Sequence, residues 1–199
     1  MEKHDHTFHH SQEFVLEAGG ILPGFQLKYT TLGTLNAERN NVVWICHALT
    51  GSPDFTDWWS GLFDGSTGHL SFNPNTGKQY FHTFPAVTNR DVVRAFDLLR
   101  QSLGIETVHT LIGGSLGGQQ VLEWAIHQPD VFQHIIPIAT NANHSPWGIA
   151  FNEAQRMAIE ADGTWKTNDQ RAGIEGLKAA RAIGMLSYRF YGTYGQTQA

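Results

Sequence analysis

The chain has 199 residues, 41% of them hydrophobic and 16% charged, which is typical of one soluble globular domain with a full core. The chain has 13 basic and 18 acidic residues, which give a net charge of −5. This balance argues against a basic surface that binds nucleic acid and against a polybasic membrane anchor. The single Cys46 excludes an internal disulfide, and there is neither a secretory segment nor a membrane-length apolar stretch, so we expect a cytoplasmic protein with small-molecule partners.

The first twelve residues are polar, and we expect residues 1–12 to form a flexible, solvated tail. It contains four histidines: His4, His6, His9 and His10. These side chains can hold a metal ion only if the tail is ordered, and no cysteine or carboxylate framework fixes their geometry. We therefore expect no metal site. After the tail, the patterns of residues 13–18 and 26–33 predict two strands joined through glycine and proline in a hairpin-like opening.

An alternation of apolar strands and amphipathic helices follows. Residues 42–46 form a short continuous apolar run, the pattern of a strand buried in a parallel sheet, and the run ends in residues 47–51. Residues 90–103 space apolar side chains at helical intervals and stop at Gly104. This alternation predicts an α/β core over residues 13–140, with a doubly wound, mainly parallel sheet and ligands at the carboxyl ends of its strands.

The most informative segment is Gly113-Gly114-Ser115-Leu116-Gly117, a G-x-S-x-G motif between a β-branched run at 107–112 and a helical pattern at 119–126. A hydroxyl at such a sharp turn needs small neighbours, because side chains at the flanking positions would collide with adjacent strands. Ser115 is therefore a candidate nucleophile beside the N-terminal amides of a helix.

Two other interpretations of this turn are open on the residues alone. A glycine-rich turn of this kind also serves as a phosphate cradle, or as a close backbone crossing without chemistry. A dinucleotide site is disfavoured, since the middle glycine is replaced by Ser115 and the strand expected at 134–140 ends without a carboxylate. A P-loop is excluded, because Phe72 stands where the glycine before Gly77-Lys78 should be.

Beyond Thr140 the pattern becomes helical. Residues 143–159 and 173–186 predict two helices with no strand between them, which is how the start of a helical lid over residues 141–199 would look.

With these elements in place, the chain resembles the homoserine O-acetyltransferase family of α/β-hydrolase-fold acyltransferases. The segments that carry the resemblance are residues 32–36, 46–51, 58–62, 65–68, 73–78, 113–118, 138–140, 150–156 and 186–189. The resemblance covers nearly everything after the tail. It implies an α/β-hydrolase fold with a helical lid, and an enzyme of methionine biosynthesis.

The resemblance also assigns roles to residues of this sequence. It implies that Ser115 is the acyl-accepting nucleophile and that the backbone amides of Leu49 and Leu116 form its oxyanion hole. Arg189 and Tyr191 match an Arg-x-Tyr pair near the homoserine site, where a guanidinium suits an α-carboxylate. The plainer alternatives are ordinary loop packing for Leu49 and a solvated lid arginine for Arg189.

The chemistry that the resemblance implies is a ping-pong transfer of acetyl from acetyl-CoA, through acyl-Ser115, to the hydroxyl of L-homoserine. It implies no cofactor, since acetyl-CoA is a substrate, and a homodimer for the complete enzyme. A succinyl donor is a narrower variant of the same hypothesis.

The chain departs from the family pattern in two places. Only His127, His134 and His144 follow Ser115, and none stands where the family carries its triad Asp and His, so neither role is assigned. The chain also passes from Phe63 directly to Asp64, where the family has a further strand and loop of about two dozen residues. We therefore expect an incomplete, inactive chain; the alternatives are an esterase or thioesterase of the same fold, or a non-catalytic remnant.

Overall fold

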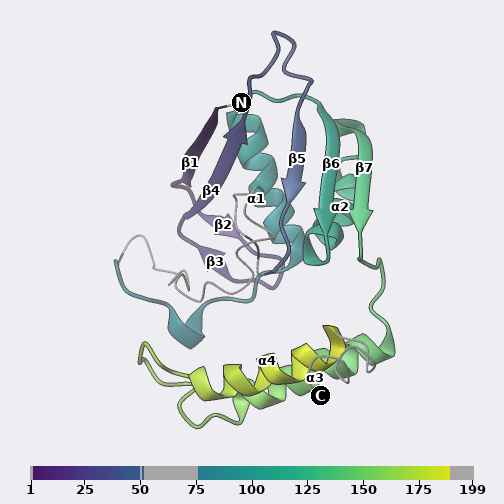
Figure 1. Ribbon diagram of the computed structural model, residues 1–199. Helices are drawn as coiled ribbons and strands as arrows, with labels where there is room; N and C mark the ends of the chain where they lie inside the picture. Colours follow the sequence, from purple (N-terminus) through teal and green to yellow (C-terminus); the bar gives the residue numbers. More distant parts are fainter. Residues whose placement is uncertain (1, 50, 52–75, 189–199) are drawn as a thin grey trace. The chain divides into compact units, whose positions relative to one another are not determined.

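The computed structural model describes residues 2–49, 51 and 76–188 (Figure 1). They fall into two compact units, one of residues 1–78 and 85–142 and the other of residues 79–84 and 143–199. The division after residue 142 lies two residues beyond the expected end of the α/β core. Each unit is described by itself below.

The first unit contains the predicted parallel sheet. Its strands β5 (Val43–Cys46), β6 (Val108–Gly114) and β7 (Phe132–Ile138) lie in the order β5-β6-β7, with Ile45 opposite Ile112 and Ile112 opposite Ile136. Helix α1 (Asn89–Ser102) precedes β6, and helix α2 (Leu116–His127) follows it. A short 3-10 helix, η3 (Pro129–Val131), leads into β7. The α/β fold class and these strands and helices are confirmed.

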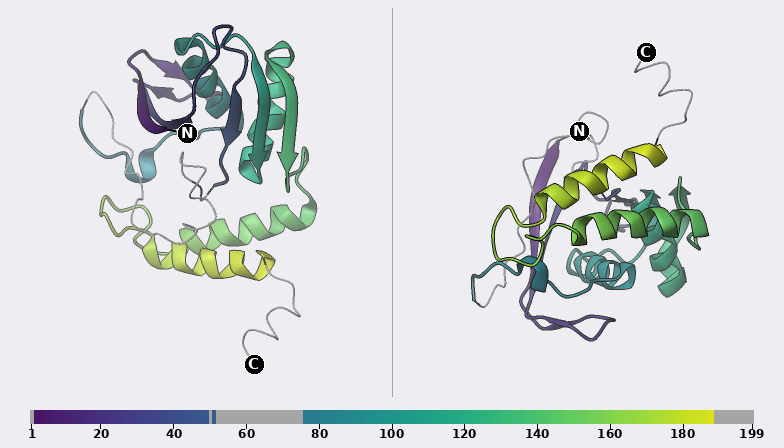
Figure 2. Two further views of the ribbon diagram at one scale, coloured as in Figure 1. Left: turned by 45° about the horizontal axis from the view of Figure 1, so that its top comes forward. Right: turned by 90° about the horizontal axis from the view of Figure 1, so that it is seen from below.

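The core lies on one face of this sheet, between the strands and both helices (Figures 1 and 2). Trp124 of α2 is 1% exposed and packs its ring edge-on against Trp44 at a centroid distance of 5.0 Å. The other buried members of this cluster are Cys46, Val93, Leu111 and Val121. Burying one large apolar side chain of this kind stabilises the fold by about 2 kcal/mol, so this face holds the two helices on the strands.

The opposite face of the sheet is apolar and open in the described part of the first unit. Strand residues alternate in direction, so Val43 and Ile136 point away from Trp44 and Leu111. Val43 is 57% exposed and Ile136 is 43% exposed. A doubly wound sheet would carry a second layer of helices there, and neither α1 nor α2 supplies it.

The expectation of a flexible tail over residues 1–12 is wrong for Lys3–His10. These residues form strand β1, which pairs antiparallel with β4 (Phe25–Leu32) along its whole length, His6 lying opposite Tyr29. The His6 ring stacks on Tyr29 at 4.8 Å, and Thr30 Oγ1 donates a 2.7 Å hydrogen bond to Asp5. Backbone pairing with β4 gives alternate residues of β1 the hydrogen-bond partners that a solvated tail would find in water.

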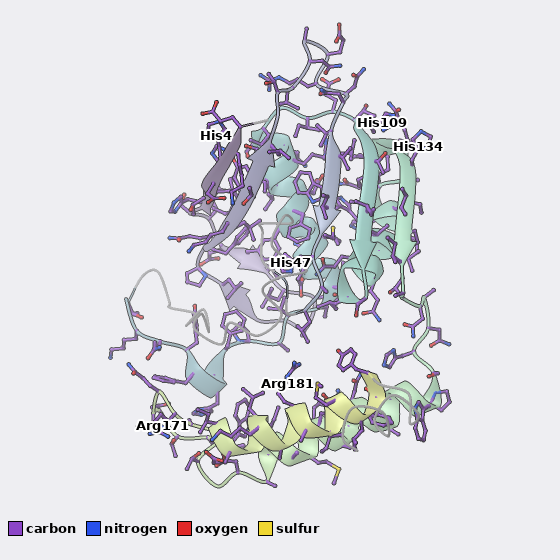
Figure 3. All side chains as sticks on the ribbon, viewed as in Figure 1. His4, His47, His109, His134, Arg171 and Arg181 are labelled. Carbon is purple, nitrogen blue, oxygen red and sulfur yellow. The ribbon has the colours of Figure 1, made fainter. Side chains whose placement is uncertain are left out.

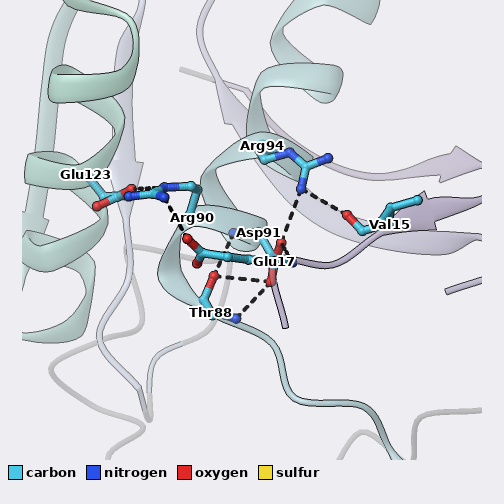
Figure 4. Close-up of polar contacts among 7 residues, drawn as sticks. All are labelled: Val15, Glu17, Thr88, Arg90, Asp91, Arg94 and Glu123. Carbon is cyan, nitrogen blue, oxygen red and sulfur yellow. Dashed lines mark hydrogen bonds and ion pairs between the residues drawn. The ribbon is translucent and has the colours of Figure 1, made fainter. Parts of the chain in front are cut away.

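A smaller hairpin, β2 (Phe14–Val15) and β3 (Ile21–Leu22), connects β1 to β4 and is fastened to α1 (Figure 4). The Asp91 side chain is fully buried and accepts hydrogen bonds from the backbone N–H of Glu17 at 2.9 Å and of Thr88 at 3.0 Å. Thr88 Oγ1 in turn accepts from Asp91 N, which completes a capping box at the start of α1. One carboxylate thus both starts the helix and anchors the hairpin.

In the described part of the chain, β5 pairs only with β6, and β4 pairs only with β1. The segment that we expect to be missing between Phe63 and Asp64 falls outside the described residues, so that expectation stays a prediction.

The second unit contains a helical pair, α3 (Pro146–Glu160) and α4 (Ile174–Tyr188), and a short 3-10 helix, η2 (Phe81–Thr83). Ser145 caps α3 by accepting from Gly148 N at 3.1 Å. The helices approach closely at Gly176, where a Cβ would lie 2.8 Å from the carbonyl oxygen of Ala158. Both helices were predicted from their periodicity. Within the described ranges, neither these nor the other helices are long and apolar enough to cross a membrane.

Candidate active site

Ser115 stands at the elbow, the sharp turn at residues 113–117 between β6 and α2, with φ 55° and ψ −118°, and it is exposed. A positive φ is a strained conformation for a residue with a Cβ, and such strain concentrates at functional sites. The Ser115 side chain makes no capping hydrogen bond to α2. The strand, the strained serine and the helix therefore have the geometry that an exposed nucleophile needs.

The neighbouring glycines are required by close contacts rather than by their own torsions. A Cβ on Gly113 would lie 2.4 Å from the carbonyl oxygen of Gly117, and one on Gly117 would lie 2.1 Å from that of Cys46. A Cβ on Gly118 would lie 2.6 Å from Thr140 Cγ2. The first turn of α2 thus packs against the ends of β5 and β7 at distances that only glycine allows, which brings the carboxyl ends of three strands to Ser115.

The two predicted oxyanion donors lie in the elements that meet at this turn. Leu116 is the first residue of α2, so its N–H is one of those that have no partner within the helix. Leu49 follows β5, and this residue is 77% exposed. The direction of its amide toward Ser115 stays a prediction.

None of the three histidines after Ser115 is placed at the elbow by a described contact. His127 ends α2, about 18 Å from Ser115 at 1.5 Å of rise per residue. His134 lies beside His109 at the amino ends of β7 and β6, the ends opposite the elbow, with ring centroids 5.1 Å apart (Figure 3). His144 bonds Asn152 Nδ2 at 2.9 Å within the second unit. Asp130 lies in η3, before the amino end of β7.

Other predicted residues lie outside the described ranges. Arg189 and Tyr191, the predicted homoserine-binding pair, belong to these, as do the resemblance segments 58–62 and 65–68. Their roles stay predictions. Among the described residues, no three His, Cys, Asp or Glu side chains are grouped so as to hold a metal ion.

The environment of the elbow distinguishes Ser115 from the one thiol nearby. Burial raises the pKa of Cys46 to about 12, so this side chain is an inert member of the core. A separate cavity of about 400 Å³ opens beside β2 and helices α1 and α2, lined among others by His10, Phe14 and Trp124. Ser115 is not among its lining residues, so this cavity is distinct from the elbow.

Sequence reasoning assigned no role to two residues that follow β7, one with a strained torsion and one in contact with Ser115. Ala139, just after β7, has φ 47°, and the Thr140 hydroxyl donates a 2.8 Å hydrogen bond to the Ser115 carbonyl oxygen. Both residues belong to the resemblance segment 138–140, but their residue types do not indicate these contacts, because alanine does not favour positive φ and a threonine at a strand end is common.

Comparison with known proteins identifies the fold family. Residues 41–180 match the family model of the alpha/beta hydrolase fold. Among solved structures, esterase E22 matches 98% of this chain and 64% of its own, with 26% identity and a TM-score of 0.84. Homoserine O-acetyltransferase from Bacillus anthracis matches 99% of this chain and 64% of its own, with 28% identity and a TM-score of 0.80.

Curated relatives confirm the resemblance to the homoserine O-acetyltransferases. The one from Cyclobacterium marinum is 47% identical over 221 residues, which cover 100% of this chain and 63% of the relative. The one from Trichormus variabilis is 43% identical and covers 94% of this chain and 59% of the relative. The chain therefore spans about three fifths of the length of these relatives. The aligned length of 221 exceeds the 199 residues of this chain by 22, so the alignment contains positions without a counterpart here.

Proposed function

Because this chain belongs to the alpha/beta hydrolase fold family, we propose that it is the nucleophile-bearing part of an acyltransferase that moves acetyl from acetyl-CoA to L-homoserine. The observation that carries the proposal is the strained, exposed Ser115 between a central parallel strand and a helix. The similarity to homoserine O-acetyltransferases over the whole chain supports the choice of substrates.

In the proposed first step, Ser115 Oγ loses its proton to a base and attacks the thioester carbonyl of acetyl-CoA. The carbon–sulfur bond breaks, CoA leaves as the thiol after protonation, and Ser115 carries the acetyl ester. In the second step the homoserine hydroxyl, deprotonated by the same base, attacks that ester. The products are O-acetyl-L-homoserine and free Ser115, and no cofactor takes part.

Negative charge develops on the carbonyl oxygen in both steps. We assign its stabilisation to the N–H groups of Leu116 and Leu49, of which Leu116 is at the N-terminus of α2, where the helix dipole favours negative charge. One such donor lowers the barrier by about 3 kcal/mol.

Among the described residues, none of the histidines that follow Ser115 is placed to serve as this base. His127 and His134 lie toward the opposite end of the sheet from Ser115, and His144 has Asn152 as a partner. We therefore propose that the triad Asp and His come from a segment that the longer relatives have in addition, and that these 199 residues alone are inactive. In a serine protease, losing the triad base costs about 10⁶-fold in rate.

Substrate selection is proposed to rest on Arg189 and Tyr191. A guanidinium fork binds the two oxygens of an α-carboxylate, and lysine keeps the charge but loses the fork. In a completed enzyme, Arg189→Lys is expected to raise the KM for homoserine far more than the KM for acetyl-CoA. Equal effects on both would indicate a role in folding. We also propose a cytoplasmic homodimer for the complete enzyme.

The decisive experiment joins this chain to the part of the Cyclobacterium marinum relative that it lacks and measures CoA release with and without homoserine. The completed protein is expected to release CoA in a homoserine-dependent manner, and Ser115→Ala is expected to abolish this. Ser102→Ala is the matched control, because the Ser102 hydroxyl donates only to the Leu99 carbonyl of its own helix. Activity that survives Ser115→Ala would show that Ser115 is not the nucleophile.

An esterase is the second candidate, since esterase E22 superposes on this chain with a TM-score of 0.84. Water would then replace homoserine in the second step. With a simple acetyl ester in place of acetyl-CoA, an esterase would release acetate and gain nothing from homoserine. A protein that shows neither activity, even when completed, would be a non-catalytic remnant.

A further inference from the structure

Two strained residues lie next to each other at the elbow. Ser115 has φ 55°, and Ala139, one residue past the end of β7, has φ 47°. Residues with a Cβ in this region cost free energy and persist only when their surroundings hold them there. The contacts that hold Ser115 should therefore be found between these two turns.

The residues on either side of Ala139 bond both backbone polar groups of Ser115. The Ser115 N–H donates to the Ile138 carbonyl oxygen at 3.0 Å. The Thr140 hydroxyl donates to the Ser115 carbonyl oxygen at 2.8 Å, and that oxygen also accepts from Gln119 N at 3.1 Å within the first turn of α2. The last residue of β7 and the residues just after it thus hold both the backbone N–H and the backbone carbonyl oxygen of Ser115.

Packing places the Thr140 side chain for this contact. Its Cγ2 and Cβ occupy the space beside Gly118, where a Cβ would come within 2.6 Å and 2.7 Å of them. Gly118 therefore allows Thr140 to approach α2. The Thr140 hydroxyl donates to the Ser115 carbonyl oxygen, and the direction of that carbonyl depends on the strained torsions of Ser115.

From these contacts we infer that Thr140 is a positioning residue, which holds the nucleophile Ser115 in its strained orientation through the hydroxyl-to-carbonyl hydrogen bond. This inference rests on the proposed function of Ser115, and it adds a residue that the resemblance did not assign. Thr140 touches only the backbone of Ser115, so it acts by orienting the serine and not by contact with a substrate.

The test uses the 199-residue chain and needs no catalytic base. In a Ser115→Cys background, the rate of alkylation by iodoacetamide is measured from about pH 5 to about pH 10, a range that spans the titration of a thiol. The natural Cys46 does not interfere, because it is buried and its pKa is about 12. A thiol at the N-terminus of α2 is expected to titrate below the ordinary cysteine pKa of about 8.5.

Adding Thr140→Val to this background removes the hydroxyl and keeps the shape of the side chain. It is expected to slow alkylation at about pH 7 by roughly fivefold, the worth of one net hydrogen bond, and to raise the apparent pKa of the introduced thiol. Thr140→Ser, which keeps the hydroxyl, is expected to restore the rate to within about twofold. The matched control is Thr110→Val, since the Thr110 hydroxyl contacts His109 and not the elbow; it is expected to change nothing.

An unchanged rate in Thr140→Val overturns the inference, and so does equal slowing in Thr140→Ser, because the hydroxyl would then not be the cause. Alkylation of Cys46 would show that a variant has lost its fold. If Thr140→Val unfolds the chain, the rate in Thr140→Ser decides whether the hydroxyl positions Ser115. A Ser115→Cys thiol that titrates at the ordinary pKa and is still slowed by Thr140→Val would count against the proposed activation of Ser115, while supporting the positioning role of Thr140.

Discussion

Replacing Asp91 by Asn should destabilise the first unit more than any other change of a single charge in its described part. The Asp91 side chain is 1% exposed, and its two oxygens accept four hydrogen bonds, from Glu17 N, Thr88 N, Thr88 Oγ1 and an Arg94 guanidinium nitrogen, at 2.9 to 3.2 Å (Figure 4). Asparagine has one acceptor oxygen, and its NH₂ group would face N–H or O–H donors that already point into the site.

The magnitude follows from the lost contacts. Losing a capping box costs about 1 kcal/mol, and a buried donor left without its charged partner costs about 1–3 kcal/mol. We expect Asp91→Asn to lower the free energy of unfolding at about pH 7 by about 3 kcal/mol. Urea denaturation followed by circular dichroism measures this, and amide hydrogen exchange should show lost protection at Glu17 and at the start of α1.

The same site predicts a pH dependence. Burial by itself would raise the pKa of Asp91, but hydrogen bonds from Thr88 and Glu17 and the charge of Arg94 outweigh it and lower the pKa below the ordinary 3.8. A carboxylate with a lowered folded pKa contributes its full stability above the unfolded pKa and loses it as the pH falls through the folded value. The difference between wild type and Asp91→Asn should therefore shrink below about pH 4.

Asp130→Asn serves as the control for this experiment, because Asp130 is exposed in η3 and should change the free energy of unfolding by less than about 0.5 kcal/mol. The reasoning would be refuted if Asp91→Asn cost no more than this control near neutral pH. It would also be refuted if the cost were the same at about pH 3 as at about pH 7.

Three further predictions concern other parts of the chain. Gly117→Ala would place a Cβ 2.1 Å from the Cys46 carbonyl oxygen, so we expect the free energy of unfolding, measured in urea, to fall by more than about 3 kcal/mol. A decrease as small as that of an exposed helix substitution would contradict the packing at the elbow. Asp162 accepts hydrogen bonds from Thr164 and from the first amides of α4, which lower its pKa to about 2. The helicity of the second unit should therefore fall as the pH is lowered from about pH 4 to about pH 2. Asp162→Asn should remove that step in circular dichroism. Cys46 should resist iodoacetamide at about pH 8 in the folded chain and react at once in urea; rapid reaction without urea would show that the core around it is open.

The sequence alone determined the central part of the molecule. The apolar runs of β5 and β6, the helical spacing of α1 and the glycines around Ser115 are local signals, and each was interpreted correctly because side-chain period and turn sterics depend on neighbouring residues only. The helices of the second unit, α3 and α4, were found from the same periodicity. The roles of Arg189 and Tyr191 remain predictions from resemblance.

Tertiary structure decided what local pattern cannot encode. Residues 3–10 have the composition of a tail and become strand β1 because β4, a segment distant in the sequence, supplies the backbone partners. The positive φ of Ala139 and the hydrogen bond from Thr140 to Ser115 arise where β7 meets the start of α2, so no spacing within either element announces them. The pKa of Cys46 is likewise a consequence of burial by residues from β6, α1 and α2. Short-range sterics thus determined where Ser115, the proposed nucleophile, stands, and contacts between elements distant in sequence determined how it is held.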